Sequence, residues 1–270
     1  MSLSAVMPIY IAQTGITKAQ EAQQEAIQEI ASGLLANVNP ADEYISQGLE
    51  TEIRAANQAM ENAQTGINVT AVADAALNNV SQSLGRIREL AVQAANGIYS
   101  DSQRNAIQME INHNVEQIRQ TLGNATFNGK DVLNVVSTGE NPAPEIRFQV
   151  GTGSGSESTV SYDPNVSLDE MNFDVTTPDG ARTALESIDN ILGDINTKRG
   201  ELGATNAKLE SSIEQQMTNM MNSTASKSSM TDADYLSAFL KFKQAGITQE
   251  SLIQVLKSSM QSQKLLLNLI

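Results

Sequence analysis

Residues 9–33 read IYIAQTGITKAQEAQQEAIQEIASG and carry a pattern that repeats every seven residues. One position of the repeat holds Ile9, Ile16, Gln23 and Ile30, and the other holds Ala12, Ala19, Ala26 and Gly33. This 3–4 spacing is typical of a helix that packs against a partner along a narrow seam. Because the seam is thin and includes a glutamine, the helix gains little stability alone, and we expect it to need a partner.

The C-terminal segment, residues 232–270, has a similar apolar periodicity and offers that partner. Two weak amphipathic tails at opposite ends of a chain become stable when they bundle with each other and with copies from other molecules. We therefore predict a self-assembling surface along both tails. Its candidate residues are Ile9, Ile16, Ile30, Leu236, Leu240, Leu252, Leu256, Leu266 and Ile270.

Between the tails the chain alternates long helical patterns with one irregular region. Ile146, Phe148 and Val150 alternate with polar residues, as do Val160 and Tyr162, which predicts a β-hairpin around the Gly/Ser tract 151–156. The predicted fold is mostly α, a long antiparallel coiled-coil bundle with a small hairpin region and with its termini paired as a terminal coiled coil. The predicted segments are an inner-core helix 1–36, a linker 37–43, a rod half 44–124, a hairpin region 125–178, a rod helix 179–225, a linker 226–231 and an inner-core helix 232–270.

Composition excludes several classes of function. The net charge of −14 disfavours contact with phosphate backbones, so no nucleic-acid partner is expected. There is no cysteine, and His113 is the only histidine, so neither thiolate metal sites nor sites with two imidazoles can form. No apolar run reaches the length of a membrane span. We expect no enzyme activity, no cofactor, no metal and no membrane partner.

Several motifs resemble bacterial flagellins in order and spacing. The clearest is Arg86-Ile-Arg-Glu-Leu-Ala-Val-Gln-Ala-Ala-Asn96, followed by Ile107-Gln-Met-Glu-Ile111 and Thr126-Phe-Asn-Gly-Lys-Asp-Val-Leu133. In the second half, Arg199-Gly-Glu-Leu-Gly-Ala-Thr-Asn-Ala-Lys-Leu-Glu210 resembles the matching C-terminal helix. The middle of the chain is short, so the chain resembles a short flagellin without large outer domains.

This resemblance implies a function and a set of partners. It implies a structural subunit that polymerises into the bacterial flagellar filament for motility and is found in the extracellular flagellum. It also implies secretion through the flagellar type III export route, which agrees with an N-terminus that lacks the features of a cleaved signal peptide. The implied partners are the chain itself, an export chaperone, hook-associated or cap proteins, and a host Toll-like receptor. The residues that match the receptor or intersubunit contact are Arg86, Arg88, Glu89, Leu90, Gln93 and Glu110.

Two other interpretations stay open on the sequence alone. One is a secreted flagellin-like protein that binds host cells or a Toll-like receptor without building a filament. The other is a hook–filament junction protein, which resembles flagellin at its ends but usually not in the stretch 86–96. Filaments of the purified protein would favour the structural subunit, whereas persistent monomers would favour the secreted binding protein.

Overall fold

The structure is a computed structural model that describes residues 3–136, 142–167 and 171–267. The chain divides into a terminal unit, Met1–Ile53 with Met221–Ile270, and a central unit, Arg54–Met220. Two helices contribute residues to both units: α2 (Pro40–Ala94) and α4 (Pro178–Thr231). The predicted mostly α fold with a small β region is confirmed.

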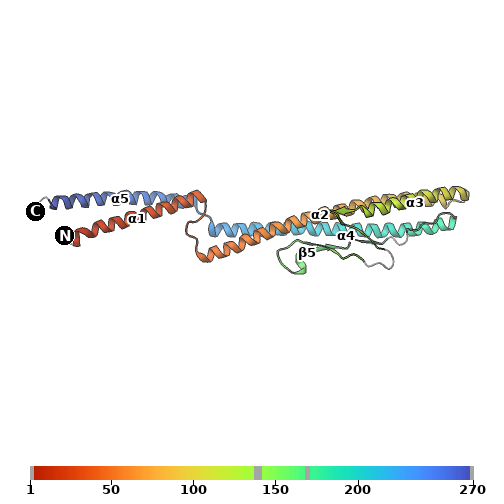
Figure 1. Cartoon of the computed structure of the whole chain (residues 1–270), viewed down its shortest axis with the longest axis horizontal. Helices are drawn as coiled ribbons and strands as arrows, with labels where there is room; N and C mark the ends of the chain where they lie inside the picture. The colour runs from red at the N-terminus through yellow and green to blue at the C-terminus, as the bar shows by residue number, and fades with distance from the viewer. Residues whose placement is uncertain (1–2, 137–141, 168–170, 268–270) are drawn as a thin grey trace. The chain divides into compact units, whose positions relative to one another are not determined.

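In the terminal unit, α1 (Leu3–Ser32) and α5 (Tyr235–Leu267) lie side by side and run antiparallel (Figure 1). The end of α1 meets the start of α5, where Lys241 pairs with Glu29 at 3.4 Å. Further along, Gly15 of α1 lies against Leu252 of α5, so the predicted pairing of the two tails is present within one chain.

The connections beside these two helices are tied together by backbone hydrogen bonds. Gly33 ends α1 with a left-handed φ of +70°, which glycine adopts without steric cost. The amide of Leu35 donates to the carbonyl of Thr231 at 2.9 Å, and the amide of Ala233 donates to the carbonyl of Gly33 at 2.9 Å. These bonds satisfy backbone groups that would otherwise be left unpaired between the helices.

The helix boundaries differ from the predicted linkers in two places. Helix α2 already begins at Pro40, and Asn39 caps it because its side-chain oxygen accepts a hydrogen bond from the amide of Ala41 (3.1 Å). Helix α4 continues to Thr231, so residues 226–231, predicted as a linker, are helical. Within this Ser/Thr-rich stretch, Lys227 forms an ion pair with Glu50 of α2. The chain is not helical at 232–234.

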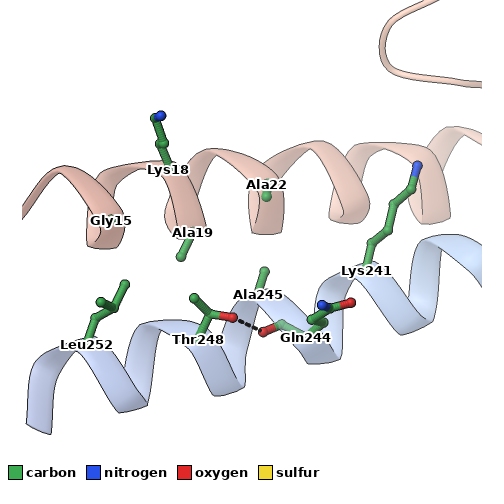
Figure 2. Close-up of a pocket in the computed structure, with 9 residues that line it drawn as sticks. All are labelled: Gly15, Lys18, Ala19, Ala22, Lys241, Gln244, Ala245, Thr248 and Leu252. Carbon is green, nitrogen blue, oxygen red and sulfur yellow. Dashed lines mark hydrogen bonds between the residues drawn. The ribbon is translucent and has the colours of Figure 1, made fainter. Parts of the chain in front are cut away.

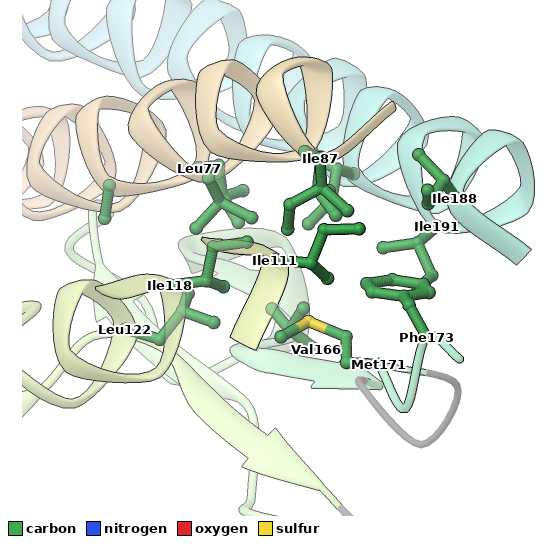
Figure 3. Packing of buried hydrophobic residues seen from close by; sticks show 14 of the residues in the cluster. Leu77, Ile87, Ile111, Ile118, Leu122, Val166, Met171, Phe173, Ile188 and Ile191 are labelled. Carbon is green, nitrogen blue, oxygen red and sulfur yellow. The ribbon is translucent and has the colours of Figure 1, made fainter. Parts of the chain in front are cut away.

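In the central unit, three helices share one apolar core. Helix α3 (Asp101–Gly123) packs with α2 and α4, and Figure 3 shows side chains of all three helices pointing into one core. An apolar stripe whose residues recur every three, four or seven positions is buried on α4, as the predicted rod helix requires. Its members are Ala184, Ile188, Ile191, Ile195, Leu202 and Leu209.

Short strands cover part of this unit. The predicted hairpin is confirmed: β4 (Ile146–Gln149) pairs antiparallel with β5 (Thr159–Tyr162), with Ile146 opposite Tyr162 and Phe148 opposite Val160. Before β5 lies a single 3₁₀ turn, η1 (Ser156–Ser158). Two further strand pairs were not predicted: the antiparallel pair β1 (Thr126–Phe127) and β2 (Lys130–Asp131), and the parallel pair β3 (Asn134–Val136) and β6 (Asn165–Ser167).

The hairpin docks on the helices at a glycine. A Cβ atom added at Gly66 of α2 would lie 3.1 Å from Phe148 Cγ and 3.1 Å from Leu209 Cδ1. We expect Gly66→Leu to lower the free energy of unfolding by about 1–3 kcal/mol, because the extra atoms overpack this contact. Chemical denaturation followed by circular dichroism measures the change.

The matched control for this prediction is Gly85→Leu on the same helix, where an added Cβ meets no atom within 4 Å. That variant should be at least as stable as the unaltered chain, because leucine is a better helix former than glycine. An equal decrease in the free energy of unfolding for Gly66→Leu and Gly85→Leu would contradict a specific contact between the hairpin and Gly66.

Candidate assembly surfaces

The seam between α1 and α5 is built from small side chains. Ala12, Ala19 and Ala26 are buried on α1, and Ala238 and Ala245 are buried on α5. Alanine at successive seam positions brings the two helices close together but buries little apolar area per residue. Helices α1 and α5 therefore approach each other closely, but their contact contributes little free energy of stabilisation.

A groove opens along this seam. Its volume is about 450 Å³, and α1 contributes Gly15, Lys18, Ala19 and Ala22 to its lining. Figure 2 shows the α5 side of the groove, with Ala245 facing Ala19 and with Leu252 beside Gly15. Gln244 and Thr248 complete the α5 lining together with Lys241.

The predicted assembly residues fall into two groups with respect to the intramolecular seam. The first group is half-buried beside it and consists of Ile9, Ile16, Ile30, Leu252 and Leu256. The second group, Leu236 and Leu240, remains 65% and 58% exposed, so these two leucines do not contribute to pairing within one chain. Ile270 and the side chain of Leu266 lie outside the described residues.

The position of Leu236 and Leu240 follows from the phase of α5. The seam runs through Ala238 and Ala245, and each leucine is two residues away from Ala238. Two residues turn an α-helix by about 200°, so these side chains are on the opposite side. Their part in contacts between copies stays a prediction.

Most residues of the second predicted surface, in the central unit, are exposed, and their contact with a receptor or another copy stays a prediction. Arg86 donates hydrogen bonds to Glu89 at 3.0 Å and to Glu110 of α3 at 2.8 Å, so two distant segments meet there. Arg88, Glu89 and Gln93 are exposed as expected. Leu90 is wrong as a contact residue, because it is only 2% exposed and belongs to the helical core.

Arg88 links two helices of the central unit. Its guanidinium donates to both carboxylate oxygens of Asp189 on α4, at 2.7 and 3.3 Å. The hydrogen bond from Arg88 and its positive charge hold the pKa of Asp189 below its usual range. Since a lowered carboxyl pKa stabilises the fold only while the group is ionised, this contribution is complete above the unfolded pKa and lost as the pH falls through the folded pKa.

We expect Arg88→Gln to weaken the pH dependence of stability below about pH 4, the range in which aspartates take up protons. The midpoint of urea unfolding, measured across this range, should fall less steeply than in the unaltered chain. Arg182→Gln is the control, because Arg182 pairs with exposed Asp179 within one helix. If the urea midpoint of Arg88→Gln depended on pH as it does in the unaltered chain, the ion pair between Arg88 and Asp189 would not contribute to stability.

The predicted site residues did not include Glu29, a carboxylate that joins the two terminal helices. Glu29 is buried, accepts from the amide of Ala36 at 3.4 Å and pairs with Lys241. The sequence did contain a signal for this residue. Glu29 follows the seam residue Ala26 by three positions, so the two lie on the same side of the helix. Among the described residues, no group of three or more His, Cys, Asp or Glu could hold a metal, and no helix is long and apolar enough to cross a membrane.

Comparison with known proteins identifies the family. The family model for the bacterial flagellin N-terminal helical region matches residues 3–138. The model for the bacterial flagellin C-terminal helical region matches residues 185–270. The chain belongs to the bacterial flagellin family.

Individual flagellin relatives match over most of their length. The flagellar filament 31.3 kDa core protein of Treponema maltophilum is 32% identical over 238 residues, with 82% of each chain covered. Flagellin FlaB2 of Treponema pallidum (strain Nichols) is 29% identical over 262 residues, with 92% of each chain covered. A solved structure of a putative flagellar hook-associated protein from Vibrio parahaemolyticus shares the fold, with a TM-score of 0.59, 17% identity and coverage of 71% of this chain and 98% of that chain.

Proposed function

We propose that this flagellin polymerises through α1 and α5, whose paired helices carry both a thin internal seam and an unpartnered apolar surface. The chain is a structural subunit of the extracellular flagellar filament and not an enzyme. The observation that carries the assignment of the assembly residues is the concentration of exposed, large apolar side chains on these two helices. They include Met7, Tyr10, Ile11, Ile27, Leu236, Phe239, Leu240, Ile247, Val255 and Met260.

The energetics of the terminal unit support this assignment. A seam of alanines buries little area, at about 25 cal/mol per Å² of apolar surface, so the helix pair is marginal as an isolated element. Each exposed apolar residue that another copy covers adds to the stability of both copies. Many identical weak contacts, repeated around a helix, give a stable polymer from a soluble subunit.

The test is a substitution in the seam. We expect Leu252→Asp to abolish filament formation, because Leu252 is half-buried against Gly15 and a carboxylate there would be desolvated without a partner. Leu252→Met is the matched control and should still give filaments, since it conserves volume and apolarity. Negative-stain electron microscopy with a sedimentation assay gives the readout. Filaments of normal length from Leu252→Asp would refute the proposed seam.

Other partners are proposals of the same kind. The exposed residues Leu236, Leu240 and Ile247 offer an apolar helical face that an export chaperone could cover before secretion. Hook-associated and cap proteins would meet the same terminal helices at the filament ends. A host Toll-like receptor would contact the exposed cluster of Arg86, Glu89 and Glu110.

The alternative of a secreted protein that binds host cells without forming filaments is not favoured. The Treponema relatives that match over 82–92% of their length are a flagellar filament core protein and a flagellin. One similar protein, secreted flagellin C of Campylobacter jejuni, is named for secretion and not for the filament, and it is 28% identical over 224 residues. The exposed apolar residues of α1 and α5 favour assembly, because large unpartnered apolar surfaces are uncommon on proteins that stay monomeric.

A further inference from the structure

The tip of the β4–β5 hairpin and helix α4 enclose a polar cavity between them. Its volume is about 330 Å³. The hairpin side of the lining includes Gly151, Glu157 and Ser158, and the α4 side includes Ser211 and Gln216. All of the lining residues belong to the central unit, so the cavity is separate from the two helices to which we assign assembly.

Hydrogen bonds within the hairpin hold its tip in place above α4. The side chain of Gln149 donates to the carbonyls of Gly151 and Gly153, at 2.8 and 2.7 Å. The amides of Val150 and Gly151 both donate to the carbonyl of Ser158, at 2.8 and 3.0 Å. The hairpin wall of the cavity is therefore part of the folded structure and is present before any ligand arrives.

On the α4 side, the lining includes a buried amide whose oxygen receives no hydrogen bond. Gln216 is only 8% exposed and follows the buried residues Leu202 and Leu209 at intervals of seven. Among the described residues, no group donates a hydrogen bond to its Oε1 atom. A buried carbonyl oxygen without a donor lowers the stability of the fold. A glutamine in line with buried leucines and beside a cavity therefore indicates a donor that comes from outside the chain.

The chemistry of the lining restricts what that donor can be. The serine and glutamine side chains around the cavity are those of Ser158, Ser211, Ser212, Gln215 and Gln216. Serine hydroxyls and glutamine amides can both donate and accept hydrogen bonds. Of the lining residues that the structure describes, Glu157 alone is charged, and its carboxylate disfavours an anionic ligand.

Several other classes of ligand match this lining poorly. A calcium or magnesium ion prefers several carboxylate ligands, and the described residues contain no group of three or more His, Cys, Asp or Glu. An ammonium group only donates, so it leaves the hydroxyl and amide donors of the lining without an acceptor. An apolar ligand would remove the polar side chains from water without replacing their hydrogen bonds. A ring with several hydroxyl groups fits best, because each hydroxyl both donates and accepts.

We propose that this cavity binds one hexose ring, with a hydroxyl of the sugar donating to Oε1 of Gln216 and others bonding to Glu157 and Ser211. The ring comes either from a free sugar or from the end of a polysaccharide chain. The cavity volume is at the lower end of the range for small-ligand sites, which suits a single ring. A ligand of this size with a few hydrogen bonds should have a dissociation constant on the order of 1–10 mM. The inference is independent of the proposed polymerisation.

NMR titration of the full-length, unpolymerised chain tests the site. The probes are the free sugars D-glucose, D-galactose and N-acetyl-D-glucosamine, together with dextran, which presents glucose at its chain ends. We expect at least one probe to shift the side-chain amide signal of Gln216, which is identified by its loss in Gln216→Leu. A response to dextran supports the end of a polysaccharide as the source of the ring, and a response to free sugars alone supports a free sugar.

Two substitutions in the lining should weaken binding at least tenfold in saturation-transfer difference NMR, which observes the sugar. Ser211→Phe fills the cavity from an exposed position of α4, and Gln216→Leu removes the acceptor. Gln216→Leu should also raise the urea midpoint of unfolding, because an apolar side chain replaces an unpaired polar group. Lost binding in that variant then cannot result from unfolding. Asn190→Phe is the matched control, because Asn190 is exposed on α4 and does not line the cavity, and it should bind sugar normally.

Three results would overturn the inference. The first is the lack of any response to all four probes at concentrations well above the expected dissociation constant. The second is sugar binding that both Ser211→Phe and Gln216→Leu leave unchanged. The third is a shift of the Gln216 signal by methylammonium but by none of the sugars, which would assign the cavity to a cationic group. None of these results depends on whether the chain forms filaments, so this inference and the proposed function can fail separately.

Discussion

Removal of residues 232–270 should abolish filament formation while the central unit stays folded. The deletion removes α5, the partner of α1. With it go the α5 alanines of the seam and the exposed leucines Leu236 and Leu240. The core of the central unit draws its residues from α2, α3 and α4 and from the strands, none of which is deleted. Polymerisation should therefore be lost completely in a sedimentation assay.

Circular dichroism adds a second readout for this deletion. Because α1 is left without its partner, its helix should also fray, and the loss of helical signal should exceed the share contributed by α5 itself. A cooperative unfolding transition of the remaining chain would show that the central unit is intact. Filaments from the shortened chain would contradict the assignment of assembly to the terminal helices.

The largest loss of stability is expected from Ile111→Ala. Ile111 is 0% exposed and belongs to the core that α3 shares with α2 and α4, where Figure 3 shows it below Ile87. Truncation of a fully buried isoleucine removes apolar contacts and leaves a cavity, which costs about 2–5 kcal/mol. Urea unfolding of the monomer, followed by circular dichroism, should show a lower midpoint at an unchanged slope.

Met109→Ala is the matched control on the same helix, because Met109 is 67% exposed. Its effect should stay within about 0.5 kcal/mol, as is usual for surface positions. Similar losses at Ile111 and Met109 would contradict the three-helix core. The two main predictions act on different units, since the deletion removes assembly and spares the central fold, whereas Ile111→Ala weakens the central fold and leaves the terminal helices unaltered.

The helical pattern was predictable because it depends on neighbours along the chain. Ile188, Ile195, Leu202 and Leu209 recur at helical spacing, and all four are buried on α4. The hairpin around residues 151–156 was predictable for the same reason, because alternation of apolar residues with a flexible turn is a local signal. The antiparallel pair β1–β2 also had a local signal, Asn128-Gly129 with positive φ at both residues, but its strands are too short for a periodic pattern.

By itself the sequence determined which segments are helical, the heptad periodicity of both tails and, through its motifs, the flagellin family. The tertiary structure alone decided which of the other apolar side chains are covered. Leu90 is buried because α2 packs in a three-helix core, and Leu236 and Leu240 are exposed because α1 packs on the alanine side of α5. The parallel pairing of β3 with β6 and the ion pair of Glu29 with Lys241 likewise join residues far apart in the chain. The spacing of apolar residues along a helix shows that they share one side of it. Contacts with segments far away in the chain decide whether that side is buried.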